Sequence, residues 1–146
     1  MPRKLLRLSE SSTVELLVFC QLFFCAIGAG VMLRFISLAH VIKFISISAN
    51  NWPLRQLPLG HRWLDYPQLT VVTEAAARAI RPDGPCLLRS LLLFWLLKAR
   101  GEHAELLIGV AKEASALNSH AWVESHGNVL GDSEENAWRF ATLLRF

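Results

Sequence analysis

The chain has 146 residues, of which 53% are apolar and 18% charged, and its formal net charge is +3. This length suits one domain with a modest core, and this composition excludes a disordered chain, which needs low hydrophobicity and high charge. The basic residues are spread along the sequence instead of forming a patch or stripe, so we expect no nucleic-acid partner.

Residues 1–60 are predicted to form an N-terminal apolar helical segment and a linker. Within residues 14–48 the apolar pattern is helical, and Glu15 and Gln21 are its first polar interruptions. The segment is long enough to be a transmembrane candidate, and the basic residues before it also imitate a signal peptide. Because the helical pattern continues past Arg34, we expect a helical hairpin that packs on the domain or on a partner. Membrane association through residues 14–48 is the alternative.

Residues 61–146 are predicted to form a core of shorter elements, in one compact unit with the segment before it. Residues 66–80 have the pattern of a helix. A second helix begins after the turn "RPDGPC" and ends at Gly101, which supplies a left-handed cap. Residues 103–113 have the pattern of a strand, and "SHAWVESHGNVLGD" (119–132) that of a hairpin turning at glycine. The tail after it is predicted as a short helix or a final strand.

The three cysteines contain no CxxC pair, which argues against a disulfide framework or a zinc site. We expect no metal and no cofactor. Cys20 and Cys25 lie in the apolar run, where cysteine behaves as a small hydrophobe. Cys86 differs because it is expected at a helix N-terminus, where the helix dipole lowers the pKa of a thiol. By itself this position also fits a buried structural cysteine.

The hairpin supplies candidate partners for that thiol. If residues 126–128 form a three-residue loop, Asp132 lies diagonal to His120 on the same face of the sheet, close enough to interact. Another loop length would need a bulge to restore this pairing, and Glu134 and Glu135 are then the reserve carboxylates. A cysteine at a helix start, followed by a histidine and an orienting carboxylate, is typical of thiol proteases and transglutaminase-like enzymes.

The segments "CLLRSLLLFWLLKARG" (86–101), "LLIGV" (106–110) and "HAWVE" (120–124), in this order, resemble the lasso-peptide biosynthesis B proteins. The closest resemblance is to their short stand-alone leader peptidases, the B2 type. The resemblance implies an α+β fold with a papain/transglutaminase-like core. It also implies that Cys86 is the nucleophile, His120 the general base and acid, and Asp132 the orienting carboxylate.

The resemblance further implies a function, which is removal of the leader from a lasso-peptide precursor before a separate macrolactam synthetase closes the ring. The implied partners are the precursor peptide, a separate leader-recognition protein of the B1 type and the lasso cyclase, and the implied location is cytoplasmic. For the second oxyanion donor we considered Trp52, Gln56 and Trp63 because of their polar tips. Two alternatives stay open: a membrane-anchored binding protein without catalysis, and a Cys-His-Asp acyltransferase.

Overall fold

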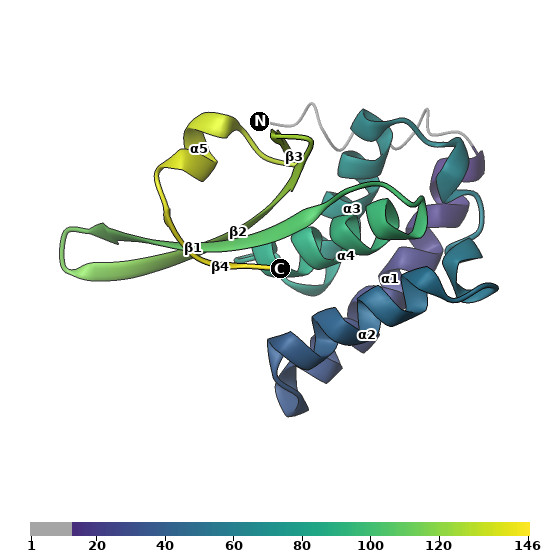
Figure 1. The fold of residues 1–146 in the computed structure, drawn as a ribbon, viewed down its shortest axis with the longest axis horizontal. Coiled ribbons are helices and arrows are strands. Elements are labelled where there is room, and N and C mark those ends of the chain that lie inside the picture. The colour runs from purple at the N-terminus through teal and green to yellow at the C-terminus, as the bar shows by residue number, and fades with distance from the viewer. Residues whose placement is uncertain (1–12) are drawn as a thin grey trace.

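The structure, a computed structural model, describes residues 13–146 and places helices against a small antiparallel sheet (Figure 1). The helices are α1 (Thr13–Phe35), α2 (Leu38–Asn50), α3 (Tyr66–Ile80), α4 (Cys86–Ala99) and α5 (Glu134–Trp138), with 3-10 turns at Leu54–Gln56 and His61–Trp63. The strands are β1 (Glu105–Glu113), β2 (Ala116–Ser125), β3 (Asn128–Leu130) and β4 (Ala141–Arg145). The predicted α+β class is therefore confirmed. The basic stretch before Thr13 lies outside the described residues.

Helix α1 is docked on the domain through one face. Val18, Leu22 and Ala26 lie four residues apart on that face and are fully buried in the core shared with α3 and α4. The two polar side chains of the apolar run, Gln21 and Glu15, also contact the domain. Gln21 exchanges hydrogen bonds of 3.1 and 2.8 Å with the backbone of Leu59, and Glu15 accepts one of 2.6 Å from Gln68 of α3. The predicted packing of this segment on the domain is thus observed.

The other faces of α1 and α2 remain apolar and exposed. Large side chains there are accessible, among them Phe24, Val31, Phe35, Phe44 and Ile47. By length and composition α1 is able to cross a membrane, although the core helix of a soluble protein passes the same test. A domain boundary near residue 60 stays a prediction.

Helices α3 and α4 form the centre of the molecule. A capping box starts α3: the Asp65 carboxylate accepts from the Gln68 N–H, while the Gln68 side chain accepts from the Asp65 N–H. Helix α4 is apolar almost all round and is buried between α3 and the sheet, as expected for a central helix. It ends as predicted, with Gly101 in the left-handed conformation at φ 80°.

The sheet has the strand order β3-β2-β1-β4, and all its neighbours are antiparallel. The β2–β3 turn corrects the predicted register. Ser125 pairs with Asn128, so the loop has two residues, not three. His126 and Gly127 both have positive φ, 50° and 81°, which is the type I′ geometry favoured in tight hairpins. The β1–β2 loop is also shorter than predicted, because β2 begins at Ala116.

The tail contains both of the elements between which the sequence left a choice. Ser133 caps the N-terminus of helix α5, and its side chain accepts from the Asn136 N–H. The helix covers the second face of the sheet (Figure 1). A small core lies under it, formed by Leu107, Trp122 and Ala137 with Val129 and Phe140. Strand β4 then returns to pair with β1, with a bulge next to Gly109. The sheet therefore separates two cores, and β2 contributes to both.

Candidate active site

Cys86 is the first residue of α4 and is partly buried. The pKa of its thiol is lowered, chiefly by a hydrogen bond with the His120 side chain. Burial opposes this shift, and hydrogen bonds from the backbone N–H groups of Ala121 and Leu87 support it. By contrast, burial raises the pKa of the Cys25 thiol. Cys86 is thus the one of these two thiols that is shifted toward the nucleophilic thiolate.

His120 lies on β2 between the thiol and a carboxylate. Its Nε2 contacts the Asp132 Oδ2, which leaves Nδ1 for Cys86. The pKa of His120 is raised, first by the hydrogen bond with Cys86, against burial, and then by the hydrogen bond and charge of Asp132. The ring also stacks on Phe140, with centroids 4.9 Å apart, and lies near-parallel to Trp122 at 6.1 Å. These contacts fix both the tautomer and the plane of the imidazole.

Asp132 reaches His120 by a different route from the predicted one. With a two-residue hairpin loop, a continued strand would put Asp132 opposite Ala121, on the wrong face of the sheet. The strand ends at Leu130 instead, and Gly131 takes a left-handed conformation at φ 76° that redirects the chain. A local break therefore restores the pair that the predicted register would have made directly.

The Asp132 carboxylate is held from several sides. Asn136 donates to both of its oxygens at 3.1 Å, and the Ser133 N–H donates to Oδ1 at 2.8 Å. Burial would raise the pKa of Asp132, but hydrogen bonds from His120, Asn136 and Ser133 and the charge of Arg89 outweigh it, and the net shift is downward. Asp132 is consequently ionised over the range in which His120 titrates.

Part of the β2 edge is not paired with β3, and α4 lies against it. Strand β3 pairs with residues 123–125 of β2 but not with Ala121, whose N–H and C=O are left to α4. The N–H helps to lower the pKa of the Cys86 thiol, and the carbonyl accepts from the Ser90 hydroxyl at 2.9 Å and from Arg89 at 3.4 Å. These bonds fasten the cysteine helix to the histidine strand, and so set the distance between thiol and imidazole.

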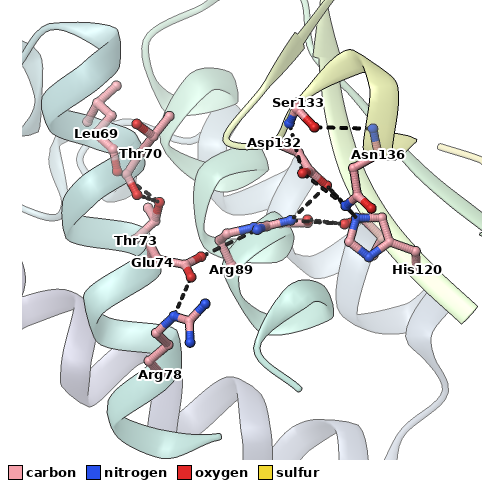
Figure 2. Close-up of polar contacts among 12 residues, drawn as sticks. Leu69, Thr70, Thr73, Glu74, Arg78, Arg89, His120, Asp132, Ser133 and Asn136 are labelled. Carbon is pink, nitrogen blue, oxygen red and sulfur yellow. Dashed lines mark hydrogen bonds and ion pairs between the residues drawn. The ribbon is translucent and has the colours of Figure 1, made fainter. Parts of the chain in front are cut away.

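Arg89 connects the site to α3. Its guanidinium lies between the Glu74 and Asp132 carboxylates, at 3.4 and 3.5 Å, and its side chain is 11% exposed. Figure 2 shows the resulting series, which runs from Arg78 and Glu74 through Arg89 to Asp132, Asn136 and His120. Sequence reasoning missed Arg89 and Asn136. The sequence offered one signal for each: Arg89 follows Cys86 by three residues, about one turn along the predicted helix, and Asn136 follows Asp132 by four residues.

The thiol opens onto a small hollow of about 70 Å³, lined by Cys86, Leu87, Ile108, Ser119, His120 and Ala121. None of the three side chains considered as second oxyanion donors lines it. Trp52, Gln56 and Trp63 are exposed, and their segment contacts the far end of α4, where Arg100 donates to the His61 and Leu64 carbonyls. We therefore withdraw these three candidates.

The other polar residues considered from the sequence lie away from the thiol. Glu134 and Glu135 are exposed in the first turn of α5, and Glu124 accepts from the Trp122 indole at 3.0 Å. His61 is fully buried, with Nδ1 2.7 Å from the Pro58 carbonyl. Within residues 13–146 there is no cluster of histidine, cysteine and carboxylate side chains suited to a metal ion.

A helix-borne cysteine, a strand-borne histidine and a carboxylate behind it define the class of thiol enzymes that work through an acyl intermediate. The sequence profile of the transglutaminase-like superfamily matches residues 29–145. The chain therefore belongs to the transglutaminase-like superfamily, whose members generally are Cys-His-Asp enzymes of the cysteine protease or acyltransferase type. No curated protein and no solved structure matches the chain significantly.

Proposed function

We propose that the protein is a cysteine peptidase that removes the leader from a lasso-peptide precursor. The observation that carries the proposal is that Cys86 and His120 line one hollow, with Asp132 hydrogen-bonded to His120 behind it. Cys86 and His120 lie on the "CLLRSL" and "HAWVE" motifs of a transglutaminase-like chain. The motifs support the substrate class through their resemblance to the lasso B proteins. The geometry supports the thiol chemistry.

In the proposed reaction the Cys86 thiolate attacks the carbonyl at the leader–core junction. The oxyanion is met by backbone N–H at the start of α4, where the helix dipole also favours negative charge. The His120 imidazolium gives its proton to the departing amine of the core peptide. Water, deprotonated by His120, then hydrolyses the thioester and releases the leader carboxylate. Asp132 stabilises the imidazolium and holds its orientation throughout.

The test is incubation with a candidate precursor and its leader-binding partner, followed by mass spectrometry. Cys86→Ala and His120→Ala should abolish leader release, and Asp132→Ala should reduce it strongly, each with the fold retained by circular dichroism. Glu134→Ala and Glu135→Ala are the matched controls, because these carboxylates follow Asp132 closely but are exposed. Full cleavage by the Cys86→Ala protein would refute the thiol mechanism.

The same experiment separates the alternatives. A leader that ends in a free carboxylate indicates hydrolysis, whereas a leader joined to an added amine indicates acyl transfer. A protein that binds the precursor but leaves it intact under all conditions indicates the non-catalytic binding role.

We also propose that the protein acts in the cytoplasm, with α1 docked on the domain. The buried stripe Val18, Leu22 and Ala26 and the hydrogen bonds of Gln21 support this placement, since insertion of α1 into a bilayer would break them. Cell fractionation with a carbonate wash tests it. Full-length protein that stays in the pellet until detergent is added would contradict the docked arrangement.

A further inference from the structure

A groove larger than the thiol hollow lies where the second half of α1, the end of α3 and the start of α4 meet. Its volume is about 460 Å³. Its walls are aliphatic and come from all three helices, with Ile27 and Val31 from α1, Ile80 from α3 and Leu87 from α4. Gly30 of α1 also lines the groove, and a Cβ there would be in ordinary van der Waals contact with the Ile80 side chain, at 4.0 Å.

The groove and the thiol hollow lie next to each other along the start of α4. Leu87, the residue after Cys86, lines both. A peptide chain whose scissile carbonyl lies at the thiol therefore has this groove beside it. The two spaces differ in size, since the hollow has about 70 Å³ and the groove about 460 Å³.

Two arginines give the groove its charge. Arg34 and Arg81 line it, and within residues 13–146 no carboxylate lies within ion-pair distance of either guanidinium. Most other arginines of the domain do have such partners, for example Arg78, Arg89, Arg100, Arg139 and Arg145. The groove thus combines an apolar wall with two uncompensated positive charges.

We propose that this groove is a substrate subsite that binds an acidic, partly aliphatic segment of the peptide next to the scissile bond. The aliphatic side chain lies against Ile27, Ile80 and Leu87, and a carboxylate of the same segment pairs with Arg34 and Arg81. This assignment rests on the proposed peptidase function, because that function puts a peptide chain across the thiol. The charge of the groove complements an acidic peptide and disfavours a basic one.

The first experiment measures binding without cleavage, so its result does not depend on the peptidase function. The Cys86→Ala protein is titrated into two fluorescein-labelled Gly-Ser peptides, one with a central Leu-Glu-Leu-Glu-Leu and the other with Leu-Gln-Leu-Gln-Leu, and anisotropy is recorded. We expect the acidic peptide to bind about tenfold tighter at low salt, as two exposed charge pairs allow, and this preference to fall as salt is added.

The variant Arg34→Gln/Arg81→Gln should abolish the preference for the acidic peptide. Two controls accompany this variant. Arg62→Gln removes an exposed arginine outside the groove, at the far end of α4, and Arg81→Lys changes a groove residue but keeps its positive charge. Equal binding of the two peptides, or an equal loss with Arg62→Gln, would overturn the proposal. So would binding of phosphatidylglycerol vesicles in place of the acidic peptide.

The second experiment uses the precursor and its leader-binding partner. The Arg34→Gln/Arg81→Gln protein should lose kcat/KM, mainly through KM, while its Cys86 alkylation rate by iodoacetamide stays unchanged. A wild-type protein that never cleaves the precursor refutes the peptidase function. A double variant that cleaves as well as wild type refutes the subsite alone.

Discussion

Replacing Arg89 by methionine tests whether the charge between α3 and α4 positions the site. Arg89 lies 3.5 Å from Asp132 and 3.4 Å from Glu74, and the side chains of Arg89 and Asp132 are 11% and 10% exposed. Methionine keeps most of the volume and removes the charge. Asp132 then retains His120 and Asn136 as partners, while Glu74 retains Arg78.

The size of the effect follows from the distance and the burial. Coulomb's law gives about 4–5 kcal/mol for unit charges about 3.5 Å apart at an effective dielectric constant of about 20. Removing one partner of a buried pair costs about 3–5 kcal/mol. Because Asp132 keeps its donors His120, Asn136 and the Ser133 N–H, we expect Arg89→Met to lower the free energy of unfolding by about 3 kcal/mol, the lower end of that range.

Urea denaturation measures this loss, and Arg78→Met is the control. Arg78 binds the same Glu74 at 2.5 Å, but its side chain is 61% exposed, so its removal should cost less than about 1 kcal/mol. Equal destabilisation by the two variants would refute the reasoning.

The pH dependence of stability gives a second readout. Since the folded-state pKa of Asp132 is lowered, its contribution is present above the unfolded pKa of about 3.9 and is lost as pH falls through the folded value. Without Arg89 that folded pKa is higher, so the loss should still begin near the unfolded pKa but should be smaller and should end at a higher pH. If the free energy of unfolding changes with pH on the acid side in the same way for the wild-type and Arg89→Met proteins, the ion pair is contradicted.

Three further predictions concern neighbouring residues. Because the pKa of Cys86 is lowered, iodoacetamide should alkylate it well below pH 8.5, and the exposed Cys20 should react more slowly. The Cys86→Ser protein is the blank, and a rate profile like that of free cysteine would argue against an activated thiol. Asn136→Ala should slow leader cleavage roughly tenfold or more, because a hydrogen bond to a charged group is worth about 1.5–3 kcal/mol, whereas Asn128→Ala, at the hairpin turn, should leave the rate unchanged. Gly109→Ala should destabilise the fold by about 1–3 kcal/mol, since its Cβ would lie 2.9 Å from Phe140 and Trp122 and 3.0 Å from the Ala141 carbonyl. Gly84→Ala, which has open space around it, should be neutral or stabilising in the same thermal melts.

Much of this architecture could be predicted from local signals. Asp65, Pro85 and Gly101 mark the ends of α3 and α4, and the position of Cys86 at a helix start followed directly from "DGPC". Local chemistry of this kind depends on a few adjacent residues, and for that reason a single sequence reveals it.

The missed features depend on contacts between distant segments. The two-residue hairpin loop and the break at Gly131 compensate each other, so Asp132 meets His120 although the predicted register was wrong. His61 is buried in the segment before α3, where Arg100, far along the chain, donates to its carbonyl. No local pattern specifies either arrangement, since both arise from how the helices and the sheet pack.

The order of the site's parts along the chain has a consequence for folding. The thiol on α4 is synthesised before Asp132 and before Phe140, which stacks on His120, and β4 closes the sheet by pairing Leu144 with Ile108. Contacts of such sequence separation form late, because loop closure must precede them. We therefore expect Cys86 to lack an oriented imidazole, and to keep the reactivity of an ordinary thiol, until α5 and β4 have docked. On this order the nascent chain is spared an activated nucleophile, and the onset of fast Cys86 alkylation during refolding tests it.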